Sequence, residues 1–223
     1  MVVIFVLATI VFFIAMDVIY LRVTARKPAS AAEPRADSLQ TMRMPRVPGG
    51  IFVSPQHSWV CVSPNGRVTV GADDFIRSAI GEIDEIQLPE MGAALKKGEP
   101  LAVLKRGDQS VRILSPVTGE VHSINADLAV HPHRMTESPY GDGWIASIRP
   151  QALAAELRSS HVAEDAASWM KTELSRFSQF LSERIRLHPA HAAVMADGGE
   201  IIEGPLASMD AACWKDFEKS FLS

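Results

Sequence analysis

The chain has 223 residues, of which 47% are hydrophobic and 22% charged, and its formal net charge is −4 at pH 7. That length is enough for one or two domains, and the composition is typical of a globular rather than a disordered protein. From Ile51 onward, 23 Asp and Glu residues outnumber 16 Lys and Arg residues, which argues against nucleic acid as the main partner. Cys61 and Cys213 are too few for a disulfide framework and share no metal-ligand spacing, so both are expected to be reduced thiols.

Residues 1–21 form an apolar run in which Asp17 is the only ionisable side chain. A helix of about 20 apolar residues can cross a hydrocarbon core, and the basic n-region of a cleavable signal peptide is missing before the run. A transmembrane anchor is therefore predicted. Residues 22–50 hold six basic and two acidic residues, a net charge of +4, which by the positive-inside rule places the soluble part on the cytoplasmic side. The sequence thus predicts a single-pass membrane protein.

Residues 22–50 are also rich in Ala, Pro and Ser without any period, which indicates a flexible basic linker. Short apolar stretches separated by turn residues follow as far as residue 150, a pattern typical of a β sandwich or flattened barrel. The stretches expected to be strands are residues 59–62, 67–70, 83–88, 100–104, 111–114, 120–124 and 144–148. One short helix is expected at residues 73–81, with Asp73 or Asp74 as its N-cap.

After residue 150 the pattern becomes helical, which predicts an added C-terminal extension over residues 151–223. Apolar residues recur at three- and four-residue steps, predicting helices at residues 151–159, 164–187 and 208–222, with a hairpin or turn at 197–204. The apolar stripe from Trp169 to Ile185 is expected to pack on the sandwich or on another helix. Docking of this stripe to a partner protein is the alternative.

Six blocks within residues 57–144 resemble the lipoyl-bearing H protein of the glycine cleavage system, in the order and nearly the spacing of that family. The blocks are His57-Ser58-Trp59-Val60, Gly71-Ala72-Asp73-Asp74-Phe75, Gly81-Glu82-Ile83, Leu88-Pro89-Glu90-Met91-Gly92, Ser115-Pro116-Val117-Thr118-Gly119-Glu120-Val121 with Asn125, and Pro139-Tyr140-Gly141-Asp142-Gly143-Trp144. The resemblance implies a lipoyl-domain or barrel-sandwich-hybrid fold over residues 51–150. It also implies a carrier without an active site of its own, in which lipoate attached to a hairpin lysine carries an aminomethyl group between enzymes.

The position that this lysine occupies in the family is Asp108 here, because ten residues on from Gly98 and seven back from Ser115 both reach it. An aspartate cannot form the lipoyl amide, since that bond requires an amine nucleophile. The surrounding residues differ from the family too. Lys105 stands where the family has glutamate, and Arg106-Gly107 replaces Ser-Val.

Three interpretations of the hairpin remain open. It has become a simple Gly-Asp turn, or it forms a basic tip that binds an acidic partner or ligand, or Lys105 is a displaced lipoylation site. The residues of the proposed tip are Lys105, Arg106, Gly107, Asp108 and Arg112. No metal site is expected, because the histidines that flank prolines, His131, His133, His188 and His191, are interpreted as exposed.

Two functional hypotheses follow. The preferred one is a membrane-anchored H-like module that is not lipoylated, needs no cofactor, catalyses nothing and binds or positions a protein partner. The alternative is a working lipoyl carrier of a glycine-cleavage-like system, modified at Lys105 or another lysine.

Overall fold

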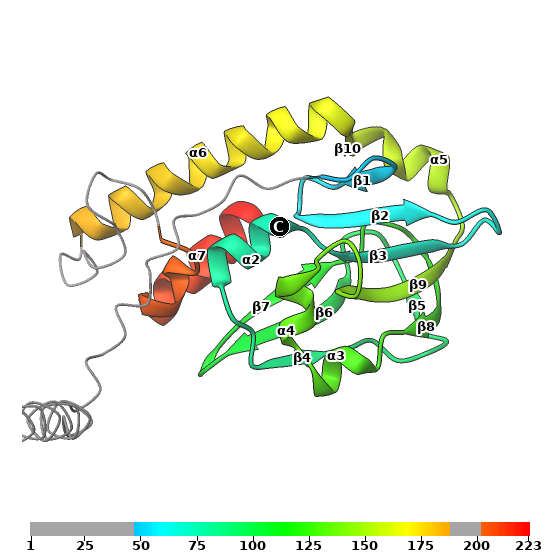
Figure 1. Ribbon diagram of the computed structural model, residues 1–223, viewed down its shortest axis with the longest axis horizontal. Helices are drawn as coiled ribbons and strands as arrows, with labels where there is room; N and C mark the ends of the chain where they lie inside the picture. Colours follow the sequence, from blue (N-terminus) through cyan, green and yellow to red (C-terminus); the bar gives the residue numbers. More distant parts are fainter. Residues whose placement is uncertain (1–46, 188–201) are drawn as a thin grey trace, which may run out of the picture. The chain divides into compact units, whose positions relative to one another are not determined.

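Strands with alternating burial form two antiparallel sheets in the computed structural model, which describes residues 47–187 and 202–223 (Figure 1). In these residues the larger sheet has seven strands, in the order β10-β1-β2-β3-β9-β8-β5, and the smaller has three, in the order β4-β6-β7. The strands are β1 Ile51–Val53, β2 Ser58–Val62, β3 Val68–Ala72, β4 Glu85–Gln87, β5 Ala94–Leu95, β6 Pro100–Arg106, β7 Gln109–Leu114, β8 Gly119–Ile124, β9 Trp144–Pro150 and β10 His161–Val162.

Helices lie between the strands at three places, namely between β3 and β4, between β8 and β9, and between β9 and β10. The remaining helices follow β10. They are α2 Asp74–Ile80, α3 Asp127–Val130, α4 His133–Glu137, α5 Leu153–Glu156, α6 Ala163–Leu187 and α7 Ala211–Phe221, with 3₁₀ turns η1 Leu157–Ser159 and η3 Pro205–Ser208. The predicted long helices are confirmed as α6 and α7, and the predicted stretch 151–159 contains α5 and η1. The turn expected at residues 197–204 lies largely outside the described residues.

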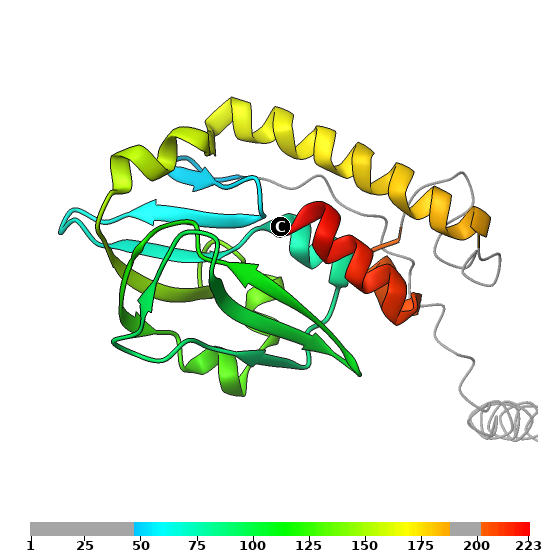
Figure 2. The same cartoon turned by 180° about the vertical axis from the view of Figure 1, so that it is seen from behind.

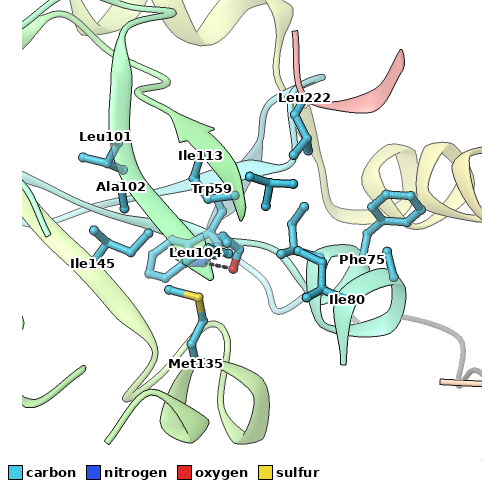
Figure 3. Close-up of a cluster of buried hydrophobic side chains, with 14 of the residues drawn as sticks. Trp59, Phe75, Ile80, Leu101, Ala102, Leu104, Ile113, Met135, Ile145 and Leu222 are labelled. Atoms are coloured by element: carbon cyan, nitrogen blue, oxygen red, sulfur yellow. Dashed lines mark hydrogen bonds between the residues drawn. The ribbon is translucent and has the colours of Figure 1, made fainter. Parts of the chain in front are cut away.

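The core between the two sheets is built around Trp59 of β2, which is 1% exposed. Its cross-strand partner on β3 is Gly71, and a Cβ there would come within 2.8 Å of the indole ring, so this glycine makes room for the tryptophan. The indole Nε1–H is satisfied by the carbonyl oxygens of Ala72, at 2.9 Å, and Pro139, at 3.1 Å. Figure 3 shows Leu104 and Ile113 of the smaller sheet in the same buried cluster as Trp59.

Helix α2 begins as the sequence predicts. The N-cap is Asp73, whose carboxylate accepts a hydrogen bond from the Phe75 backbone N–H at 3.0 Å, and this satisfies one of the free donors of the first turn. The helix ends at Gly81, with φ of +76°, a conformation that glycine adopts without strain. The prediction of a short capped helix is confirmed.

The C-terminal helices pack onto the sandwich through an aromatic cluster that surrounds Phe75 of α2. Three aromatic rings lie close to the Phe75 ring. The distance between ring centroids is 5.4 Å for Phe177 of α6, and 6.2 and 5.5 Å for Phe217 and Phe221 of α7. All four side chains are at most 2% exposed. Figures 1 and 2 show α7 beside α2, with α6 along the same side of the molecule. The packing interpretation of the α6 stripe is thereby confirmed.

The two cysteines are free, with Cys61 partly exposed and Cys213 buried. Burial of Cys213 on α7 raises the pKa of its thiol to about 11, which keeps it protonated at neutral pH. The thiol therefore contributes to the core as a small apolar group.

The prediction of a membrane-spanning helix needs correction. Among residues 47–187 and 202–223, no helix is both long and apolar enough to cross a bilayer, and residues 1–21 lie outside the described residues. The described fold is a β sandwich with C-terminal helices, and we withdraw the transmembrane helix, the single-pass membrane assignment and the cytoplasmic placement. These predictions rested on hydropathy, which gives the apolar length of a segment and not its structure.

Candidate functional site at the hairpin tip

The candidate site is the hairpin formed by β6 and β7. Arg106 pairs with Gln109, which leaves Gly107 and Asp108 as a two-residue turn. Gly107 has φ of +55°, and glycine at the first central position is the pattern of a type II′ turn, whose twist suits antiparallel strands. Asp108 is exposed and makes no hydrogen bond or ion pair within the described residues. Its carboxylate thus occupies the outermost position of the hairpin.

Lys105 lies on β6 and not on the turn. Its cross-strand partner on β4 is Glu85, and its Nζ donates a hydrogen bond to the Glu85 carboxylate at 2.9 Å. This hydrogen bond lowers the pKa of Glu85. The only lysine in the proposed tip therefore has its amine next to a neighbouring strand, and its side chain is 35% exposed.

Arg106 and Gly107 fasten the end of the hairpin to the segment between α2 and β4. The guanidinium of Arg106 donates to the carbonyl oxygen of Ile80, the last residue of α2. The backbone N–H of Gly107 donates to the Asp84 carboxylate at 2.7 Å. These contacts hold the turn against the sandwich.

Arg112 on β7 is tied to α7. Its backbone N–H and its Nε–H both donate to one carboxylate oxygen of Glu218, at 3.1 and 2.8 Å. The hydrogen bond with Glu218 raises the pKa of Arg112, whose side chain nevertheless remains 59% exposed. The C-terminal extension therefore supplies a partner to the proposed tip.

The structure brings the predicted tip residues together but pairs each basic side chain within the chain. Sequence reasoning missed the partners Asp84, Glu85 and Glu218. The acidic pair at 84–85 could have been found as a cross-strand match to Lys105, since opposite charges favour facing positions. Glu218 is separated from Arg112 by 106 positions and has no local signal.

The predicted exposed histidines lie elsewhere. His131 and His133 flank Pro132 at the start of α4, are both exposed, and have ring centroids 5.7 Å apart. Across the part of the chain that the structure describes, no group of three His, Cys, Asp or Glu side chains could hold a metal ion. His188 and His191 lie outside the described residues.

In the described residues the chain is a β-sandwich domain with a hairpin in its smaller sheet and added C-terminal helices. The family model for the glycine cleavage H-protein matches residues 52–173, more than half of the chain. The chain belongs to this family. The match ends within α6, so the rest of that helix, η3 and α7 lie beyond it.

Two sequence relatives agree with this assignment. A probable glycine cleavage system H protein of Pyrococcus abyssi is 35% identical over 127 residues, which are 57% of this chain and 94% of the relative. The glycine cleavage system H protein of Marinobacter nauticus is 38% identical over 106 residues, which are 48% of this chain and 82% of the relative. A crystal structure of a glycine cleavage system H protein from Mycobacterium marinum is 25% identical and has a TM-score of 0.48, with 57% of this chain and 98% of that chain covered.

The hairpin does not fit the lipoyl group that the family resemblance implies. Amide attachment requires a free amine at an accessible tip, and the tip here carries the Asp108 carboxylate. The amine of Lys105 lies on a strand and is hydrogen-bonded to Glu85. The residues at the tip therefore do not supply the free amine that a lipoyl amide needs.

Proposed function

We propose that this chain is an H-like protein that is not lipoylated and acts as a non-catalytic binding or scaffold module. The observation that supports this most directly is Asp108, an exposed carboxylate on a two-residue turn where an arm-bearing lysine would be required. The surrounding recognition residues have changed as well, because the basic residues Lys105 and Arg106 stand where the family has glutamate and serine. Members of the family are carriers without a catalytic site of their own, which accords with a non-enzymatic role.

A protein is the partner that this proposal favours, because family members work together with other proteins of the glycine cleavage system. The contact surface would be the tip, of which Gly107, Asp108 and Arg112 are exposed. Arg112 is paired with Glu218 yet 59% exposed, so its guanidinium can still contact a carboxylate on a partner.

The mass of the natively expressed full chain tests the absence of lipoylation. We expect the unmodified mass, whereas a lipoyl or octanoyl adduct on any lysine would overturn the proposal. A lipoylated family member expressed in the same cells serves as the positive control, because it shows that the modifying enzymes are active.

Charge reversal tests the tip as a binding surface. We expect a triple variant to capture the partner less well than the unaltered chain, and the loss should be larger at low salt. The variant carries Lys105→Glu, Arg106→Glu and Arg112→Glu. The control adds Glu85→Lys and Glu218→Lys, which restores two of the internal pairs while the tip stays acidic. If the control recovers capture, the basic tip serves only internal pairing and is not a contact surface.

The alternative is a working lipoyl carrier modified at Lys105 or another lysine, and membership of the H-protein family favours it. The mass measurement separates the two functions. An adduct that disappears in Lys105→Arg would establish the alternative at that residue, and peptide mapping would locate an adduct on any other lysine.

A further inference from the structure

His57 is fully buried in the loop before β2, with 0% of its surface exposed. Its imidazole stacks on Phe75 of α2, with 4.0 Å between ring centroids, and lies 5.0 Å from the Trp169 ring of α6. The backbone of His57 has φ of +60°, in the left-handed region that residues other than glycine rarely adopt. Such a conformation persists only where the surrounding contacts hold it.

Two carboxylates from different segments face the two ring nitrogens. Nδ1 lies 2.8 Å from Oδ2 of Asp73, whose other oxygen caps α2. Nε2 lies 3.7 Å from Oε2 of Glu173 on α6, a side chain that is also buried. The imidazole therefore connects the start of α2 with the middle of α6.

The geometry indicates which protons the ring carries. A carboxylate only accepts hydrogen bonds, so the contact with Asp73 places a hydrogen on Nδ1. A neutral ring would then turn the lone pair of Nε2 toward the Glu173 oxygen, and the two would repel. A hydrogen on Nε2 makes the ring an imidazolium between two anions, which removes this repulsion.

With both carboxylates ionised, the charges around His57 balance when it is protonated. Nη2 of Arg176 lies 2.7 Å from the same Glu173 oxygen. One imidazolium and one guanidinium then face two carboxylates, whereas a neutral His57 would leave an excess negative charge in the core. Buried charges are tolerated where they are paired, and an unpaired one is strongly unfavourable.

The remaining charged groups nearby are engaged elsewhere. His161 of β10 stacks on the Trp169 ring at 4.7 Å, and its Nδ1 pairs with Asp165 at 2.7 Å. Asp74 of α2 pairs with Arg77 of the same helix. Burial lowers the pKa of His57, but the attraction of Asp73 and Glu173 outweighs it and raises the pKa above its ordinary value.

We propose that His57 is a buried imidazolium that holds α6 against the sandwich. The packing of α6 on the sandwich therefore depends on pH. The stabilisation is complete below the unfolded-state pKa of about 6.5 and is lost as pH rises through the raised folded-state pKa. Among the described ion pairs, deprotonation leaves Arg176 as the cation beside the carboxylates of Asp73 and Glu173, and this favours separation of α6. The inference does not depend on whether the hairpin is lipoylated.

Nitrogen-15 NMR of the full chain with labelled histidine tests the protonation state, because the two ring nitrogens distinguish imidazolium from either neutral tautomer. His57→Gln identifies the signal by its loss, and contacts with the Phe75 and Trp169 rings identify it if that variant does not fold. We expect an imidazolium at pH 7, when an ordinary histidine is mainly neutral. A neutral His57 at or below pH 6.5 would overturn the proposal.

Glu173→Gln tests the link to α6, since it keeps the side-chain volume and removes the charge. We expect His57 in this variant to bind its proton roughly tenfold more weakly than in the unaltered chain. The α6 amides should therefore lose their protection from exchange at a lower pH. Glu183→Gln, at an exposed position of the same helix, should change neither quantity. An unchanged His57 titration in Glu173→Gln would refute the link.

The unaltered chain provides a second measurement if Glu173→Gln does not fold. Hydrogen-exchange protection of α6 amides is followed against that of β2 and β3 while His57 is titrated. We expect protection of α6 to fall about tenfold more than protection of the strands once His57 loses its proton. Equal protection across the titration would show that α6 does not depend on the charge.

Discussion

Glu218 on α7 accepts two hydrogen bonds from Arg112 on β7, one from the backbone N–H and one from the side chain. In the described structure β7 is an edge strand of the three-stranded sheet, and edge strands present free backbone donors that can pair with other chains. The C-terminal extension therefore satisfies one of these donors and holds the hairpin. Helix α7 of the extension thus contacts the hairpin that forms the candidate site.

Glu218→Ala is expected to loosen this contact while leaving the fold intact. The ion pair is partly exposed, so we expect a loss of less than about 1 kcal/mol in the free energy of unfolding. The Arg112 amide should exchange with solvent faster, because it loses its acceptor. Urea unfolding and amide exchange measure the two effects, and Glu183→Ala on α6 is the control. Unchanged exchange at Arg112 would contradict the contact.

Phe217→Ala should be far more costly, because its side chain is 0% exposed and lies in the aromatic cluster with Phe75 and Phe177. Removal of a buried phenylalanine costs about 3–5 kcal/mol through lost burial and the cavity left behind. Chemical unfolding of the variant measures this loss. Leu187→Ala, at a position 54% exposed, should change stability by less than about 0.5 kcal/mol. Similar values for the two variants would show that α7 is not part of the core.

Asp108→Lys together with Lys105→Glu is expected to create a lipoylation site, because it restores an amine at the tip and the family's acidic residue three positions earlier. The change also frees Glu85 from its ion pair. Incubation with a lipoate-attaching enzyme, ATP and lipoate, followed by mass measurement, tests this. Asp108→Asn with Lys105→Glu is the matched control and should stay unmodified. If the lysine variant also stays unmodified, the scaffold has lost more than the attachment residue.

Local signals explain which parts of the fold could be predicted. Helix α2 was predictable because Asp73 precedes an apolar helical pattern and Gly81 follows it, and the hairpin was predictable from Gly107-Asp108 between two apolar stretches. Strands β1, β5 and β10 have three residues or fewer, too few to show a period. Helices α3 and α4 are similarly short and were missed.

The partners of the hairpin could not be predicted for a different reason. The sequence shows Lys105 and Arg112 as basic residues in an unusual place, but it does not show that Glu85 and Glu218 pair with them. Such pairs are set by tertiary packing, which brings α7 against β7 across 106 positions of sequence. His57 is similar, because the sequence places it only within a resemblance block and its partner Glu173 comes from α6.

Gly119 at the start of β8 gives a test of how closely β8 packs against its neighbour β9 in the larger sheet. It pairs with Pro150 of β9, and a Cβ at this position would clash with the backbone oxygen of Arg149. Because a backbone atom cannot move aside as a flexible side chain does, Gly119→Ala should destabilise the fold by about 1–3 kcal/mol. Gly49→Ala is the matched control, since a Cβ there meets nothing within 4 Å. Thermal and urea unfolding compare the two variants. Equal stability would mean that β8 and β9 can separate at this point, and the Ser-Pro-x-x-Gly block would then serve the turn and not the sheet.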